Sequence, residues 1–241
     1  MPRRFLRARI YEFLPNWRSS RRRWPRVSRK KIENSERKGV SAKVFSRAVD
    51  ALKRGEVIVF PTETFYGLGA DAFNETAVEQ VVFLKGRKPE NPIPVIIAGR
   101  EMLKDIVTDV PTVARKLMER FWPGPLTLVL PGKKNLPAPL LNRGGGVGIR
   151  ISSHPLATRL ARELGRPLTA TSANPSGKEP ARSIEAAMSY FSSRIEIFLD
   201  GGRLKGRKGS TVVEIVQNEL KIIREGEIRR EELEKILTTG H

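Results

Sequence analysis

The stretch that decides the fold is VIVFPTETFYGLGAD, residues 57–71. VIVF is an apolar, β-branched run of the kind that fills an inner strand, and the proline after it ends the strand because proline has no N–H for the ladder. A loop rich in hydroxyls and glycines follows: Thr62 and Thr64 offer side-chain oxygens, while Gly67 and Gly69 let a ligand approach the backbone. We therefore predict an inner strand that leads into a ligand-binding loop, with an ordinary tight turn as the alternative.

Helical and strand patterns alternate outward from this stretch in both directions. Upstream, Ser41 can cap a helix whose apolar residues share one face, and Gly55 ends it before the strand. The other predicted helices cover 74–84, 111–121, 154–164, 183–191 and a last one from about 229, and the other predicted strands cover 93–97, 126–130, 147–151, 167–171, 195–199, 211–216 and 220–223. This order favours one α/β or mixed α+β domain, with ligands at loops beyond the strand ends.

Length and composition set the class of protein. At 241 residues, 39% of them hydrophobic, the chain can bury a full core. It has no cysteine, which excludes disulfides, thiolate zinc sites and cysteine nucleophiles, and its two histidines give no basis for a metal cluster, so no metal site is predicted. No apolar run approaches the roughly 20 residues that cross a bilayer. We expect a soluble, globular protein that does not span a membrane.

The formal net charge of +19 is concentrated at one end of the chain. Residues 1–39 hold 14 Lys or Arg against three acidic residues, a net +11, which leaves +8 for the rest. We predict a basic, disordered N-terminal extension over 1–40 and a folded domain over 41–241. The extension suits RNA binding by counterion release, with its aromatic side chains stacking on bases. A dispensable extension, residues upstream of the true start and an organelle transit peptide are the alternatives.

Familiar nucleotide motifs do not fit the chain. Residues 201–211 have the glycines and lysines of a P-loop without its spacing. Residues 67–72 match G-x-G-x-x-A, but too far from the end of the strand for a dinucleotide fold. His154 precedes a proline at a predicted helix start, which favours a capping or packing role over a catalytic one.

Residues suited to phosphate groups lie in separate loops instead. Lys85 and Arg87 flank a glycine at the end of a predicted helix, where they also suit the helix dipole. TATSANPSG, residues 169–177, crowds hydroxyl and amide side chains into one turn, which is alternatively a plain Ser/Asn turn. Ser210 begins a predicted strand and Arg224 closes one. Such cations and hydroxyls suit anionic substrates.

Seven motifs occur in the order found in one family. They are PTETFYGLGAD, KGRKPENPI, FWPGPLTLVL, VGIRISSHP, TATSANPSG, STVVEI and IIREGEI, spread over about 43–237. In this order they resemble the YrdC-like proteins, the threonylcarbamoyl-AMP synthases. The resemblance does not cover the basic extension. It implies a YrdC-like fold, a twisted mixed sheet flanked by helices with a positively charged concave site, and a body without the further C-terminal domain of longer members.

The resemblance also implies an activity. Such an enzyme, a nucleotidyltransferase, joins L-threonine, bicarbonate and ATP, with Mg²⁺ as cofactor, into threonylcarbamoyl-adenylate and releases pyrophosphate. A tRNA threonylcarbamoyl transferase complex then moves the group onto the adenosine beside the anticodon in tRNAs that read ANN codons. A cytoplasmic location and binding of tRNA or double-stranded RNA go with this role.

The motifs also imply site residues. Around L-threonine the resemblance places Thr62, Thr64, Asn91, Arg150 and Ser210. Around ATP it places Lys85, Arg87, Thr171, Ser172, Asn174 and Arg224, with Lys85, Arg87 and Thr62 as catalytic residues. Displacement at the α-phosphate builds negative charge that such cations neutralise, and the forked guanidinium of Arg150 suits a carboxylate. No acid–base dyad stands out among these residues.

The chain departs from the family pattern at several positions. Lys88 stands where the family usually has proline, Ser152 and Ser153 where it often has Pro-Asp, Gly144–Gly146 where it often has a threonine, and PARS (180–183) replaces a serine-containing turn. Two alternative functions follow. One is a paralogue of the same fold that makes another carbamoyl or acyl adenylate, and the other is a non-catalytic RNA-binding module. Lys85 and Arg87, which we call the K-x-R pair, and residues 172–174, which we call the SAN loop, favour an enzyme, since a cationic RNA surface requires neither.

Overall fold

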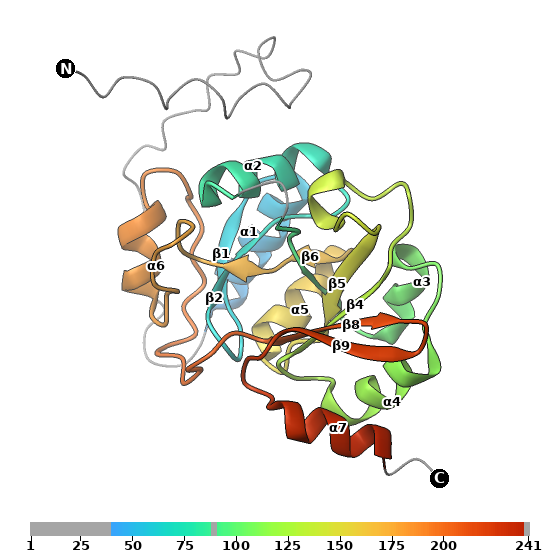
Figure 1. Ribbon diagram of the computed structural model, residues 1–241. Helices are drawn as coiled ribbons and strands as arrows, with labels where there is room; N and C mark the ends of the chain where they lie inside the picture. Colours follow the sequence, from blue (N-terminus) through green and yellow to red (C-terminus); the bar gives the residue numbers. More distant parts are fainter. Residues whose placement is uncertain (1–39, 88–90, 239–241) are drawn as a thin grey trace, which may run out of the picture.

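The structure, a computed structural model, describes residues 40–87 and 91–238. The predicted basic extension lies outside these residues except for Val40, and so does Lys88. Two β-sheets form the body of the molecule, with helices packed around them (Figure 1). None of the helices in these two ranges is long and apolar enough to cross a membrane.

The smaller sheet is antiparallel and contains the stretch that the sequence singled out. Its order is β1 (Ile58–Pro61), β2 (Tyr66–Gly69) and β7 (Thr171–Ser172). Phe60 pairs with Gly67, and Pro61 with Tyr66, so β1 and β2 form a hairpin. The loop of this hairpin, residues 62–65, carries the two predicted threonines.

The larger sheet has six strands and is mixed. Its order is β6 (Leu168–Thr169), β3 (Val95–Ile96), β5 (Gly146–Arg150), β4 (Leu126–Pro131), β8 (Thr211–Val216) and β9 (Glu219–Arg224). The pairs β3–β5 and β4–β8 are parallel, and the other neighbours are antiparallel. The predicted fold class, a mixed sheet flanked by helices, is confirmed.

Helices cover the sheets on several sides, as Figure 1 shows. α1 (Ala42–Lys53) and α5 (Pro155–Leu164) pack against each other and against β1. α4 (Thr112–Phe121) packs against α7 (Arg230–Thr238), while α2 (Glu75–Lys85) contacts a 3₁₀ turn over Ala138–Leu140. Side chains of Ser41, Asn74 and His154 accept backbone N–H groups at the starts of α1, α2 and α5. This confirms the predicted cap at Ser41, the predicted helix start at Asn74 and the capping alternative for His154. The other helices are α3 (Leu103–Ile106), α6 (Ile184–Phe191) and the 3₁₀ turn Arg100–Met102.

The prediction of a glycine-rich ligand loop after β1 was wrong in part, because Gly67 and Gly69 lie in strand β2. A Cβ atom at Gly69 would lie 2.8 Å from Cε1 of Phe60, and one at Gly67 would lie 3.2 Å from the same atom. These glycines therefore make room for the Phe60 ring of the partner strand. Gly67 still lines the cleft described below together with the loop before it, whereas Gly69 does not.

Two other predicted strands also differ from the structure. Residues 195–199 form no strand, because their pairing with β1 is a single parallel bridge between Val59 and Phe198. The predicted strand 167–171 divides at Ala170, with β6 in the larger sheet and β7 in the smaller. The segment 167–171 therefore passes from one sheet to the other, whereas 195–199 lies along β1 and bonds there only to Val59.

Candidate functional site

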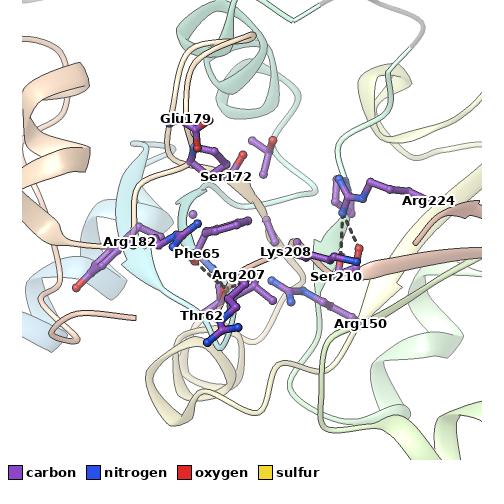
Figure 2. Close-up of a pocket in the computed structure, with 18 of the residues that line it drawn as sticks. Thr62, Phe65, Arg150, Ser172, Glu179, Arg182, Arg207, Lys208, Ser210 and Arg224 are labelled. Atoms are coloured by element: carbon purple, nitrogen blue, oxygen red, sulfur yellow. Dashed lines mark hydrogen bonds between the residues drawn. The ribbon is translucent and has the colours of Figure 1, made fainter. Parts of the chain in front are cut away.

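A cleft of about 380 Å³ lies between the hairpin loop 62–65 and the larger sheet. The hairpin lines one wall, and Arg150, Ser210 and Arg224 line the opposite wall, as Figure 2 shows. Eight predicted site residues line this cleft: Thr62, Thr64, Arg87, Arg150, Thr171, Ser172, Ser210 and Arg224. Residues far apart in the sequence therefore meet in one place, as the motifs implied.

A β-bulge in β9 turns Arg224 toward the cleft. Val213 pairs with Ile222 and Val212 pairs with Arg224, so Ile223 has no partner on β8. Regular alternation would place Arg224 on the same face as Ile222, whereas the extra residue moves it to the face of Val212. There Arg224 Nη2 donates to the carbonyl oxygen of Ser210 at 2.7 Å.

The hydroxyls of the hairpin loop have different roles. Thr62 Oγ1 donates to the carbonyl of Phe65 at 2.7 Å and accepts the backbone N–H groups of Thr64 and Phe65. Because the Thr62 proton is used, Thr64 is the donor in the 3.1 Å contact between the two side-chain oxygens. Thr62 thus holds the turn, and Thr64 keeps lone pairs that can accept from a ligand.

Lys85 lies behind the cleft wall and is only 4% exposed. Its Nζ donates to the carbonyl oxygens of Ser172 and Asn174, both at 2.7 Å. Burial, and secondarily the charge of Arg87, lower the pKa of Lys85 to about 7. Lys85 therefore holds the SAN loop by hydrogen bonds, and its burial makes the protonated form of the amine costly in the protein without a ligand.

Arg87 and Arg224 extend this group of cations. Arg87 donates from Nη1 to Thr171 Oγ1 at 3.0 Å and from Nη2 to the carbonyl of Pro92 at 2.8 Å. Burial and the charge of Arg224 lower the pKa of Arg87. Desolvation in the cleft and the charge of Arg150 lower the pKa of Arg224, which stays accessible to solvent, so this repulsion is partly screened. Lys85, Arg87, Arg224 and Arg150 thus form a row of mutually repelling cations, which we call the cation row.

Arg150 is the end of the cation row that has a carboxylate partner. Its Nη1 donates to Glu63, and Ser152 Oγ donates to the other oxygen of the same carboxylate. The Arg150 side chain is 6% exposed and that of Glu63 is 14% exposed. The sequence interpretation missed Glu63, although its place between Thr62 and Thr64 marked it.

Other cleft residues were also missed. Phe65, Glu179, Arg182, Arg207 and Lys208 line the cleft, and the guanidinium of Arg182 lies 5.9 Å from the centre of the Phe65 ring. Backbone N–H groups of residues 207 and 208 donate to Glu227 Oε1 at 2.7 and 2.6 Å. The basic run of residues 203–208 was tested only as a P-loop, which hid its position beside the cleft.

Three predicted site residues do not line the cleft. Lys85 and Asn174 lie behind Ser172, where the Asn174 amide donates to the carbonyls of Pro175 and Lys178. Asn91 contributes its backbone carbonyl, which accepts from Arg87 Nε at 2.6 Å. These residues support the wall. His154 caps α5, and burial lowers its pKa although Glu63 acts in the opposite direction.

Comparison with known proteins places this cleft in a family. A model named Sua5/YciO/YrdC, whose description is telomere recombination, matches residues 50–226. The chain belongs to this family. A Bacillus subtilis member, a threonylcarbamoyl-AMP synthase, is 40% identical over 197 residues, covering 81% of this chain and 57% of the relative. A Pyrococcus abyssi threonylcarbamoyl-AMP synthase is 37% identical over 190 residues, covering 79% of this chain and 56% of the relative.

A solved structure of a family member shows the same architecture. The crystal structure of P. abyssi Sua5 complexed with L-threonine matches with a TM-score of 0.78 at 36% identity, covering 83% of this chain and 59% of that chain. The chain therefore spans less than two thirds of the length of these family members.

Proposed function

We propose that this protein is a threonylcarbamoyl-AMP synthase, which makes threonylcarbamoyl-adenylate from L-threonine, bicarbonate and ATP. The observation that carries the proposal is that three members of the cation row, Arg87, Arg150 and Arg224, line one cleft together with the hydroxyls of the hairpin loop. Two family relatives carry this name, and a third comparison is a complex with L-threonine. In the cell we place the enzyme in the cytoplasm, upstream of a tRNA threonylcarbamoyl transferase complex, with tRNA or double-stranded RNA as a further partner of the basic surface.

The two ends of the cleft suit different substrates. Arg150, with its planar fork, suits the carboxylate of L-threonine. Thr64 on the hairpin wall and Ser210 on the opposite wall offer hydroxyls to the other polar groups of the amino acid. Arg87 and Arg224 suit the phosphates of ATP, with Lys85 acting through Ser172 and Asn174. Thr171 and Ser172 complete this nucleotide wall.

The reaction proceeds in two balanced steps. The threonine amine attacks bicarbonate and water leaves, giving a carbamate; a carbamate oxygen then attacks the α-phosphate and pyrophosphate leaves. The cation row stabilises the negative charge that builds on the phosphate oxygens. The chain therefore contributes mainly by positioning and charge stabilisation, with Thr62 holding the loop that aligns the amino acid.

The residues of the cleft fit a Mg²⁺ ion that arrives with ATP. Within 40–87 and 91–238, no group of three or more His, Cys, Asp or Glu residues could hold a metal. Glu179 and Glu225 line the cleft, and Mg²⁺ at phosphates is commonly held by one or two carboxylates with the phosphate oxygens and water. When bound, the ion would neutralise charge on the phosphates.

The test is pyrophosphate release by the purified full chain. We expect release with ATP and Mg²⁺ only when both L-threonine and bicarbonate are present. Release with another amino acid or acyl acceptor in place of threonine would indicate a paralogue that makes a different adenylate. RNA binding without any release would indicate a non-catalytic RNA-binding module. Either result overturns the proposal.

A further inference from the structure

Glu63 is the carboxylate buried against the cation row. It lies in the hairpin loop between two residues that line the cleft, yet it is absent from the lining itself. One of its oxygens accepts from Arg150 and the other from Ser152. Ser152 is 1% exposed, and its Oγ also accepts the backbone N–H of His154 at 3.2 Å, so this hydroxyl is fixed on both sides.

Glu63 makes the two ends of the cation row differ in charge. Among the described residues, Glu63 makes the ion pair recorded for the cation row, and it does so only with Arg150. Arg87 and Arg224, which line the cleft, make no ion pair among the described residues, whereas the charge of Arg150 is partly neutralised by Glu63. One end of the row is therefore suited to a polyanion and the other to a single negative charge.

We propose that Glu63 is a positioning and selectivity residue, anchored by Ser152, that aims the Arg150 guanidinium at a single carboxylate and keeps phosphate groups at the other end of the cleft. The inference rests on the proposed function, since it assigns threonine to the Arg150 end. Two physical effects contribute. The carboxylate orients the fork of Arg150 against repulsion from Arg224, and it repels a dianionic phosphate more strongly than a monoanionic carboxylate.

The same geometry excludes Glu63 as the base for the threonine amine. Both carboxylate oxygens accept strong hydrogen bonds from neighbouring side chains. The group is also absent from the lining of the cleft. Glu63 therefore acts through Arg150.

The experiment compares Glu63→Gln with the parent protein in the pyrophosphate assay. Glutamine keeps the size of the side chain and removes its charge. We expect the KM for L-threonine to rise roughly tenfold, while the KM for ATP and the kcat at saturating threonine change by less than about threefold. We expect inorganic phosphate to compete only weakly with threonine in the parent and strongly in the variant. A merely structural role would not produce this change in inhibition.

Further variants keep the test decisive if Glu63→Gln folds poorly. Ser152→Ala leaves the carboxylate but frees one oxygen, and it should raise the KM for threonine by a smaller factor. Glu63→Asp should recover part of the parental KM. Glu163→Gln is the matched control, because Glu163 pairs with Arg159 on the exposed side of α5, and its kinetics should equal those of the parent.

The outcomes separate the two proposals. An inactive parent protein refutes the synthase assignment and this inference with it. An active parent whose threonine KM and phosphate inhibition are unchanged by Glu63→Gln refutes the role of Glu63 alone. An equal rise in the KM for ATP and in the KM for threonine would likewise show that Glu63 does not separate a threonine end of the cleft from a phosphate end.

Discussion

Lys85 shows how a single residue can connect the structure of the cleft to its use. The ammonium is buried against Ser172 and Asn174, and its pKa falls from 10.5 to about 7. Between these values the unfolded chain binds more protons than the folded chain, so the contribution of Lys85 to stability rises with pH across this window. Below pH 7 the buried charge is a constant cost, which an anion in the cleft can offset.

This pKa leads to a prediction for nucleotide binding. An anion beside the SAN loop favours the ammonium form and raises the pKa of Lys85, so ATP binding should take up a proton at pH 8. Affinity should then weaken as pH rises from 7 to 9, by at most about tenfold per unit. Calorimetry in two buffers of different ionisation enthalpy measures the uptake.

The matched variants for this prediction are Lys85→Met and Lys53→Met, since Lys53 lies exposed in the last turn of α1. Lys85→Met should lose the proton uptake, and Lys53→Met should retain it. Uptake that persists in Lys85→Met would assign the proton to another group.

Activity gives a second test at the same scale. Lys85→Ala and Arg224→Ala should each lower the rate of adenylate formation by at least roughly a hundredfold, because each removes charge near the phosphates. Circular dichroism should show that both variants remain folded. Parental rates in both would contradict the assignment of ATP to this end of the cleft.

Sequence reasoning found most of the residue types of the site but not their positions. Lys85 and Arg87 were identified as a pair, yet the structure places Lys85 behind the wall and Arg87 in it. The helix end that carries both residues does not reveal which side chain turns inward. Glu63 was missed for a related reason, because its role depends on Arg150, which lies far away in the sequence.

Among the elements, the loop over residues 203–209 makes a close backbone contact with the hairpin. A Cβ atom at Gly206 would lie 2.3 Å from the carbonyl oxygen of Thr64. The loop therefore packs directly on the hairpin, and Arg207 and Lys208 follow at the cleft. Since the contact is with the backbone of Thr64 and not with a flexible side chain, a side chain at position 206 must displace one of the two loops.

We predict that Gly206→Ala destabilises the fold by roughly 1–3 kcal/mol. It should also raise the KM for threonine, because the hairpin loop shifts. Thermal unfolding and steady-state kinetics measure the two effects. Gly144→Ala is the control, since its Cβ would lie no closer than 3.4 Å to Asn142 Oδ1. Similar melting temperatures for the two variants would show that the loops can separate without cost.

The pattern of apolar residues predicted an element well where local contacts alone determine its structure. The helices predicted to begin near Ser41, Asn74 and His154 were confirmed because local hydrogen bonds define their starts. The pattern was insufficient for β2, whose glycines reflect the Phe60 ring on the adjacent strand. It was also insufficient for Arg224, because a bulge changes the face of every residue beyond it.

At the scale of the whole molecule, the net charge of +19 separates into two parts with different expected roles. The folded domain carries cations around its cleft, whereas residues 1–39 carry a net +11. Cations outside the cleft are expected to contribute affinity for phosphates of nucleic acid without contributing to adenylate formation.

Deletion of residues 1–39 should therefore weaken RNA binding and reduce its dependence on salt, while pyrophosphate release stays at the parental rate. RNA affinity measured across a salt series, beside the pyrophosphate assay, tests both parts. Loss of adenylate formation on deletion would show that these residues belong to the enzyme.

The passage of the chain between the two sheets at Ala170 determines how the cleft can move. Thr169 pairs in the larger sheet and Thr171 in the smaller, so one residue joins the two walls. A bridge between Asp71 and Leu168 joins the end of β2 to β6 in the same region. We therefore expect the walls to stay joined at this end of the cleft. If they do, substrates of the proposed reaction enter and products leave by movement of surface loops such as residues 203–209, and these loops set any conformational limit on turnover.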